Sequence, residues 1–167
     1  MLNQRTSLSP YLRCCLLSGL LFALPVAADT LAPDFSLPGR DQTVNLSAMR
    51  GKVVYVDFWA SWCKPCQQSF PWMNRMQKQY REQGLVVVGI NLDKSRELSD
   101  DFLKKIPANF TLAYDPDGKM ATAYRVKGMP SSYLIDRQGR IQKTHIGFRE
   151  ETSGDMEAAI RALLEKQ

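Results

Sequence analysis

An apolar strand that runs directly into two closely spaced cysteines and a long helix constrains this chain more than any other feature. Residues 53–59 read VVYVDFW, a β-branched and aromatic run that is apolar at nearly every position. Such a run predicts a strand that is covered on both faces. Cys63 and Cys66 follow it, and residues 64–83 favour a helix. The apolar face of that helix is predicted to consist of Phe70, Met73, Met76 and Tyr80.

The next segments continue the alternation of strand and helix. Gly84 closes the long helix and residues 85–90 predict a second buried strand, so the order implies parallel pairing through a right-handed crossover. A helix–strand piece follows, with its strand at 110–114, and a short helix is expected at 119–125. The first of these two helices is indicated by the spacing of Leu98, Phe102 and Ile106.

The last part of the chain predicts a hairpin and a helix. Residues 132–136 and 140–146 form two strands joined by an RQG turn, which gives the sheet an antiparallel edge. Thr152 and Asp155 suggest a capping box at the start of the final helix. With an extended lead-in at 32–46, this order indicates one α/β domain. The buried stripe of the final helix is predicted to be Met156, Ile160, Leu163 and Leu164.

The first residues have the composition of an export signal. Two arginines are the only charges there, an apolar run at 14–24 follows, and small residues at 26–28 suit cleavage. The run is shorter than the roughly 20 residues that a membrane-spanning helix needs. We therefore interpret residues 1–28 as a secretory signal peptide, with an uncleaved membrane anchor as the alternative. Residues 29–167 are then the mature domain, which we expect in the periplasm.

Cleavage would leave few cysteines and a small positive charge. Cys14 and Cys15 would leave with the signal, so Cys63 and Cys66 would be the cysteines of the exported protein. Two of the 22 Lys and Arg residues would be lost and all 17 Asp and Glu kept, which lowers the formal net charge from +5 to +3. The sequence contains no basic tract that would predict nucleic-acid binding. A single cysteine pair in an oxidising compartment indicates a functional pair rather than a structural disulfide.

Other uses of the cysteine pair fit the sequence less well. A zinc site needs four ligands, and the mature chain offers two cysteines and the isolated His145. Haem attachment would need a histidine directly after Cys66, where Gln67 stands. A structural brace across so short a loop would constrain the unfolded chain very little. Redox exchange is the remaining interpretation, with no metal and no cofactor beyond the Cys63–Cys66 disulfide.

The position of the pair suits thiol–disulfide exchange. Cys63 stands at the start of a helix, where unpaired N–H groups and the helix dipole favour its thiolate, and Lys64 adds a nearby cation. Cys66 lies one turn deeper on the same helix face, close enough for a disulfide and shielded from solvent. Pro65 stiffens the spacer and has no N–H, which limits stabilisation of the thiolate. One cysteine can therefore attack a substrate while the other resolves the complex.

Taken together, these motifs resemble thioredoxin. The segment VDFWASWCKPC at 56–66, the proline Pro71 inside the helix and the GMP sequence at 128–130 match its active-site strand and helix and its cis-proline loop. The helix–strand piece within 90–120, the APDF sequence at 32–35 and the export signal are more similar to exported thioredoxins of the TlpA/ResA type. The resemblance implies a thioredoxin fold, with a central mixed β-sheet flanked by helices, a helix–strand insertion and an N-terminal extended lead-in.

The resemblance also implies roles for individual residues. Asp57 would be a buried acid with a raised pKa that takes the proton of Cys66, whereas the sequence alone fits equally well an acid on a partly wet face. The Met129–Pro130 bond would be cis and would present the Met129 backbone to an extended substrate beside Cys63. An apolar groove around the reactive sulfur would be lined by Trp62, Pro65, Gly147 and Phe148.

The direction of electron flow is expected to be that of a reductant. The Lys64–Pro65 spacer lacks the histidine typical of strong oxidants. The implied substrates are disulfides in exported proteins, and the implied electron donor is a membrane conduit of the DsbD or CcdA type. We expect a monomer. The alternative within the same chemistry is a disulfide oxidase or isomerase.

Two further residues bear on the alternatives. Ser69 stands where reductases of the TlpA/ResA type usually have a glutamate, which weakens a specific role in cytochrome c maturation. A copper-carrying thioredoxin-like chaperone would use Cys63, Cys66 and His145, but that family usually spaces its cysteines by three residues. We expect His145 to be an ordinary strand residue beside the hairpin.

Overall fold

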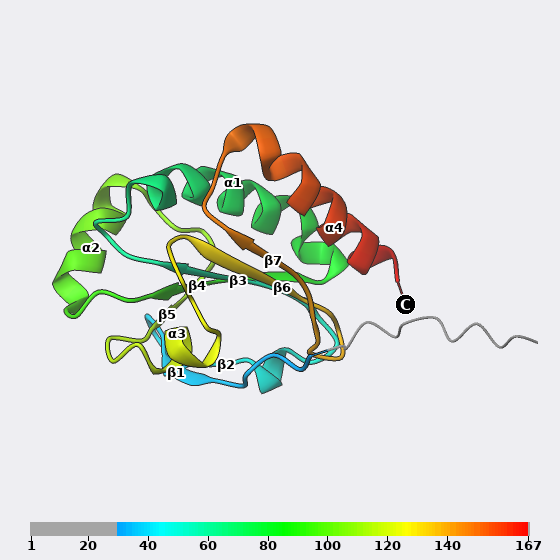
Figure 1. Ribbon diagram of the computed structural model, residues 1–167, viewed down its shortest axis with the longest axis horizontal. Coiled ribbons are helices and arrows are strands. Elements are labelled where there is room, and N and C mark those ends of the chain that lie inside the picture. Colours follow the sequence, from blue (N-terminus) through cyan, green and yellow to red (C-terminus); the bar gives the residue numbers. More distant parts are fainter. Residues whose placement is uncertain (1–29, 167) are drawn as a thin grey trace, which may run out of the picture.

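One five-stranded sheet forms the centre of the protein. The computed structural model describes residues 30–166. The sheet has the strand order β5-β4-β3-β6-β7, and a separate two-stranded sheet, β1-β2, precedes it in the chain (Figure 1). The strands are β1 (Ser36–Pro38), β2 (Thr43–Asn45), β3 (Val53–Trp59), β4 (Leu85–Asn91), β5 (Thr111–Tyr114), β6 (Ser131–Ile135) and β7 (Ile141–Ile146).

The strand directions agree with those predicted from the sequence. β4 runs parallel to β3 and β5 runs parallel to β4, as a crossover through a helix requires. β6 is antiparallel to β3 and β7 is antiparallel to β6, so the C-terminal hairpin forms the predicted antiparallel edge. Every residue of β3 is buried, as its apolar run predicts. The predicted mixed sheet with a helix–strand insertion is therefore confirmed.

Helices cover both faces of the sheet. α1 (Lys64–Tyr80) and α4 (Ser153–Glu165) lie on one face, while α3 (Lys119–Ala123) lies on the other face together with the β1-β2 hairpin (Figure 1). The inserted helix α2 (Arg96–Lys105) follows β4, and its Phe102 packs against Trp59 of β3 and Phe70 of α1. Short 3₁₀ turns occupy Ser47–Met49, Arg81–Gln83 and Glu150–Thr152.

The alternation of side chains along β3 divides the core into two layers. Tyr55 and Trp59 belong to the cluster that contains the buried residues of α1 and α4, whereas Val56 and Phe58 belong to the cluster on the α3 side. Successive side chains of a strand point to opposite faces. Asp57 has the same parity as Tyr55 and Trp59 and therefore faces the α1 layer.

The long helix α1 has the ends and the buried face that the sequence predicts. Cys63 is its N-cap, and beyond Tyr80 the chain tightens into a 3₁₀ turn. Gly84 follows with a φ of 102°, in the left-handed region that glycine adopts readily. The four residues predicted for the apolar face are all buried.

Phe70 joins α1 to the sheet and to the insertion. Its ring centroid lies 4.8 Å from that of Trp59 on β3 and 4.9 Å from that of Phe102 on α2. The ring of Phe110, just before β5, lies 5.2 Å away. Aromatic pairs at these distances contribute beyond their buried area. Phe70 is therefore a central packing residue for three separate elements.

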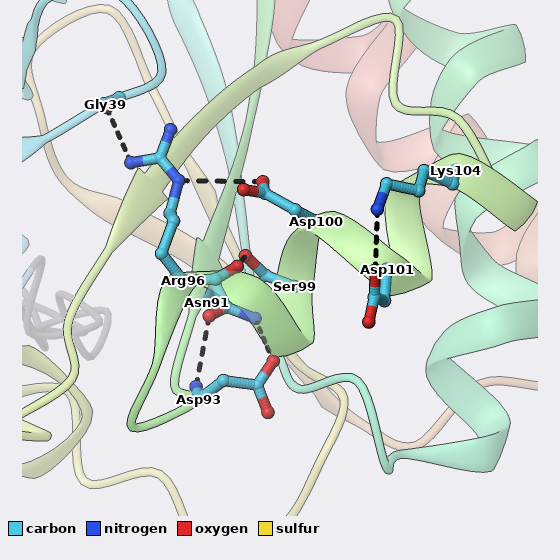
Figure 2. Close-up of polar contacts among 8 residues, drawn as sticks. All are labelled: Gly39, Asn91, Asp93, Arg96, Ser99, Asp100, Asp101 and Lys104. Atoms are coloured by element: carbon cyan, nitrogen blue, oxygen red, sulfur yellow. Dashed lines mark hydrogen bonds and ion pairs between the residues drawn. The ribbon is translucent and has the colours of Figure 1, made fainter.

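Arg96 fastens the insertion to two neighbouring segments. Its guanidinium carbon lies 3.7 Å from the centroid of the Tyr114 ring on β5. Nη1 donates a hydrogen bond of 3.3 Å to the carbonyl of Gly39, in the turn between β1 and β2 (Figure 2). Nε lies 3.7 Å from a carboxylate oxygen of Asp100, one turn further along α2 (Figure 2). The half-buried side chain thus links α2, β5 and the lead-in.

The helix that Leu98, Phe102 and Ile106 indicate is present as α2, but Leu98 does not face the core. Leu98 is 50% exposed, whereas Ser99 beside it is fully buried. Phe102 and Leu103 are the other buried residues of α2. The spacing of Leu98, Phe102 and Ile106 fits a helix face, but the packed face is centred one position further along.

The predicted capping box of α4 is also absent. Thr152 occupies the N-cap position but its side chain makes no capping bond. Its hydroxyl donates instead to the carbonyl of Arg149 at 3.2 Å. The physical reason is the 3₁₀ turn at Glu150–Thr152, which gives Thr152 helical dihedral angles and turns its side chain toward the preceding residues.

The described part of the chain includes no helix that is both long and apolar enough to cross a membrane. The predicted signal peptide at residues 1–28 lies outside the described residues.

Phe70→Ala should lower the free energy of unfolding by about 3–5 kcal/mol, because it removes a fully buried ring and leaves a cavity among three other aromatic residues. Urea unfolding of the oxidised protein would measure this loss. Leu98→Ala is the matched control and should change stability by no more than about 0.5 kcal/mol. Equal losses in the two variants would contradict the assignment of Phe70 to the packed core.

Candidate active site

Cys63 and Cys66 form a disulfide at the N-terminus of α1, with their Cα atoms 5.3 Å apart. Cys63 is the N-cap, and its Sγ accepts a hydrogen bond of 3.3 Å from the N–H of Cys66. The same donor and the helix dipole would stabilise a thiolate at Cys63 after reduction. Cys63 is 4% exposed and Cys66 has no exposure. The first turn also contains Pro65, while Lys64 is exposed at the helix start.

A buried carboxylate at the end of β4 holds the turn before Cys63. Asp93 is 5% exposed and accepts hydrogen bonds of 2.9 Å from both the N–H and the hydroxyl of Ser61. It also accepts one of 2.7 Å from the Asn91 amide (Figure 2). Because β3 and β4 are parallel, their C-terminal ends meet at one edge of the sheet. The sequence analysis missed Asp93, although its place just after a parallel strand is the signal that would indicate it.

Asp57 is fully buried in β3. Of the two positions considered for it, this is the buried one and not the partly wet face. Its Oδ1 accepts a hydrogen bond of 2.8 Å from the Ser132 hydroxyl, and the Ser132 oxygen accepts one of 2.7 Å from the Tyr55 hydroxyl. Its Oδ2 has no partner among the described residues. Burial raises the pKa of Asp57 from 3.8 to about 7, while the bond from Ser132 lowers it.

Tyr55 and Ser132 were not indicated by the sequence analysis. Ser132 lies directly opposite Asp57 in the antiparallel pair of β3 and β6. That register depends on how the hairpin seats on the sheet, which the hydrophobic pattern of the strands leaves open. A chain of two hydroxyl donors therefore ends on one oxygen of the carboxyl and leaves the other without a donor.

A groove of about 580 Å³ opens beside Cys63. One wall is the start of α1, and the other is the loop before β6, where the Met129–Pro130 bond is cis as predicted. Trp62 is 69% exposed on the first wall, and Pro130 is buried. Trp62, Pro65 and Met129 line the groove as expected. The lining also contains Lys64 and five residues that the sequence analysis did not identify: Leu92, Ala121, Val126, Lys127 and Gly128.

The structure corrects the predicted groove at Gly147 and Phe148, which do not line it. The Gly147 N–H donates a hydrogen bond of 2.7 Å to the Pro130 carbonyl, so Gly147 ties the end of β7 to the cis-proline loop. The ring of Phe148 lies 6.0 Å from that of Trp72 and borders a second cavity of about 200 Å³. His145 borders this second cavity and not the groove.

Ser69, at the position where the family resemblance implies a glutamate, is a buried residue of α1. It is 1% exposed, and its hydroxyl donates a hydrogen bond of 3.0 Å to the Cys66 carbonyl. The hydroxyl carries no charge, and it donates its proton to a carbonyl of the same helix. Asp57 is the carboxyl that β3 directs toward the layer of α1, the helix that carries the redox pair.

Comparison with known proteins gives a consistent result. Residues 28–144 match the model of the AhpC/TSA family. The thiol-disulfide oxidoreductase ResA of Bacillus subtilis (strain 168) is 33% identical over 122 residues, which cover 72% of this chain and 68% of that protein. A crystal structure from Chlorobium tepidum, provisionally named thiol:disulfide interchange protein DsbE, is 51% identical with a TM-score of 0.80, covering 81% of this chain and 96% of that chain. The exposed lipoprotein thioredoxin Etrx1 of Streptococcus pneumoniae is 31% identical with a TM-score of 0.69, covering 78% of this chain and all of that chain (100%).

Asp57→Asn should remove a pH dependence of stability. The folded oxidised protein keeps the Asp57 proton up to about pH 7, whereas the unfolded chain releases it near the ordinary pKa of 3.8. Between these values the unfolded state binds fewer protons, so the free energy of unfolding of the unsubstituted protein should fall as the pH rises. Over this interval the free energy of unfolding of Asp57→Asn should rise by about 2–4 kcal/mol relative to that of the unsubstituted protein. Urea unfolding at a series of pH values would measure the difference.

Ser132→Ala and Ser131→Ala form a matched pair for the same measurement. Losing the Ser132 bond should raise the pKa of Asp57 further and extend the decline in stability to higher pH. The Ser131 hydroxyl donates to the Gly128 carbonyl instead, so its loss should leave the pH range unchanged. An Asp57→Asn variant whose stability declines in parallel with the unsubstituted protein would contradict the raised pKa.

Proposed function

The chain belongs to the AhpC/TSA family and is a thiol-disulfide oxidoreductase of the ResA type, and we propose that it works as a reductase of disulfides in exported proteins. The observation that carries this proposal is the position of the two cysteines relative to the groove. Cys63 borders an open groove, and Cys66 has no exposure. One sulfur is placed to meet a substrate, while the other is reached only through it.

The proposed cycle starts from the reduced pair. The Cys63 thiolate attacks one sulfur of a substrate disulfide, forms a mixed disulfide with it and releases the other sulfur as a thiolate, which takes a proton from solvent. Asp57 then accepts the proton of the Cys66 thiol. The Cys66 thiolate attacks Sγ of Cys63, and the second substrate sulfur leaves as a thiolate. Two electrons have then passed to the substrate, and the Cys63–Cys66 disulfide has formed.

The residues around Cys63 support its role as the attacking sulfur. The Cys66 N–H already donates to its Sγ, and Lys64 adds a positive charge at the same helix end. Pro65 supplies no N–H, so it limits the number of donors to the sulfur. This balance, together with a spacer that lacks histidine, favours a reductant over a strong oxidant.

We assign substrate contact to the two walls of the groove. The Met129 backbone lies in the loop wall, where an extended segment would pair with it as an added strand. Trp62 supplies a broad apolar surface on the opposite wall. Pro130 shapes the loop, and Gly147 supports it through the hydrogen bond to the Pro130 carbonyl. Phe148 lies outside the groove and is not included in this assignment.

We place this activity outside the cytoplasm, with residues 1–28 as the signal peptide and 29–167 as the thioredoxin-like domain. The composition of the first residues supports this location, and the similar S. pneumoniae protein is named as an exposed lipoprotein. A reductant in an oxidising compartment must be recharged, so the proposed electron donor is a membrane conduit of the DsbD or CcdA type. Ser69 gives no support for a dedicated role in cytochrome c maturation.

The redox state of the pair in cells tests the proposed direction. Acid trapping followed by alkylation with a mass tag should find Cys63 and Cys66 mostly reduced, because a reductase depends on a maintained supply of electrons. A Cys63→Ser/Cys66→Ser variant is the control for tagging elsewhere in the chain. A mostly oxidised pair would instead assign the protein to the disulfide oxidases or isomerases.

Cys66→Ser should accumulate mixed disulfides between Cys63 and substrate proteins, because the resolving thiol is missing. Non-reducing electrophoresis after acid trapping would detect them as bands that disappear on reduction. Cys63→Ser is the matched control and should trap far fewer partners, since the remaining Cys66 is fully buried. Equal trapping by the two variants would contradict the assignment of Cys63 as the attacking sulfur.

A further inference from the structure

The groove beside Cys63 has charge of one sign on its walls. Among its lining residues the charged ones are Lys64 on the α1 wall and Lys127 on the loop wall, and both are exposed. The segments that form the two walls, residues 58–81 and 118–135, contain no Asp or Glu. The buried carboxylate of Asp115 accepts hydrogen bonds from the N–H groups at the start of α3 and does not line the groove. The groove is therefore an apolar centre with a cation on each side.

The carboxylate nearest in the sequence to this lining, that of Asp93, does not line the groove. Asp93 is 5% exposed, and its carboxylate is taken up by the N–H and hydroxyl of Ser61. On the loop wall, the exposed Arg125 adds another cation next to the lining. The ion pairs found within residues 30–166 include neither Lys64, Arg125 nor Lys127. These charges are therefore available to a partner.

The shape of the groove fits an extended segment. Trp62 and Pro65 form apolar surface on one wall, and Val126 and Met129 do so on the other. In an extended chain, neighbouring side chains point in opposite directions. When the attacked cysteine points at Cys63, the residues beside it are directed toward the walls.

We propose that this groove selects disulfide-bonded segments that carry an acidic side chain within about two residues of the cysteine that Cys63 attacks. The inference rests on the proposed function, because it assumes attack by Cys63 in this groove. Lys64 and Lys127 stand on opposite walls, so a carboxylate on either side of the attacked cysteine meets a cation. Complementary charge raises the rate of encounter, and like charge lowers it.

Three short peptide probes test the selectivity. Each has one cysteine held as a mixed disulfide with thionitrobenzoate, and the residues beside it are Asp, Asn or Lys. Attack by Cys63 and resolution by Cys66 transfer two electrons to the probe, which leaves as the peptide thiol and coloured thionitrobenzoate. At low ionic strength the reduced protein should react with the Asp probe about fivefold faster than with the Asn probe, and slowest with the Lys probe. In about 0.5 M salt the rates should converge.

Lysine variants locate the effect. The double variant Lys64→Gln/Lys127→Gln should bring the ratio of the Asp rate to the Asn rate close to one at low salt. Lys78→Gln removes an exposed lysine at the far end of α1 and should leave the ratio unchanged. The ratio is the informative quantity, because Lys64→Gln also alters the reactivity of Cys63 toward every probe alike.

Two outcomes would overturn the inference and leave the proposed function in place. One is equal reaction of the Asp and Asn probes at low salt, and the other is a ratio that persists in the double variant. Failure of the reduced protein to release thionitrobenzoate from any probe would remove the proposed function, and this inference with it.

Discussion

The burial of one carboxyl in the central strand is the constraint on which the site depends. Asp57 lies opposite Gly89 of β4 on one side and opposite Ser132 of β6 on the other. Gly89 brings no donor, and a Cβ added there would lie 2.9 Å from the ring of Phe110. Ser132 therefore supplies the hydrogen bond that the described side chains give to the carboxyl. A fully buried carboxyl with one neutral donor titrates near neutral pH, where thiol chemistry needs a proton acceptor.

The side-chain periodicities of β3 and α1 place Asp57 and Cys66 in the same layer of the core. The two-residue repeat of β3 turns Asp57 toward α1, and the turn of α1 places Cys66 inward while Cys63 caps the helix at the groove. The ends of neighbouring strands supply the rest. Asp93 fixes the turn before Cys63 from the end of β4, and the loop that contains the cis bond before Pro130 enters β6. The reactive sulfur is thus positioned by segments that are far apart in the sequence.

Local patterns predicted most of the fold because each element carries its own signal. The apolar run of β3, the buried stripe of α1 and the hairpin at the sheet edge all depend on residues close in sequence. The exposed position of Leu98 is a shift of about one position around α2, which spacing alone does not resolve. The capping box of α4 is absent although Thr152 is the N-cap, because the 3₁₀ turn before the helix redirects its side chain. The hydrogen bonds to Asp57 and from Ser61 to Asp93 join different strands, so they follow from register rather than from any local pattern. The separation of Phe148 from the groove has the same origin, because it depends on where the chain turns after β7.

Asp57 does not by itself set the direction of electron flow. A carboxyl with a pKa of about 7 is present in both charge states near neutral pH, so it can take the Cys66 proton when the disulfide forms and return it when the disulfide is reduced. In the proposed cycle it would therefore speed both directions and leave the equilibrium to the relative stability of the dithiol and disulfide forms. That stability depends on how strongly the start of α1 favours the Cys63 thiolate. The Cys66 N–H and the charge of Lys64 would favour it and Pro65 withholds a donor, so we assign control of the reduction potential in the proposed cycle to the residues between the two cysteines.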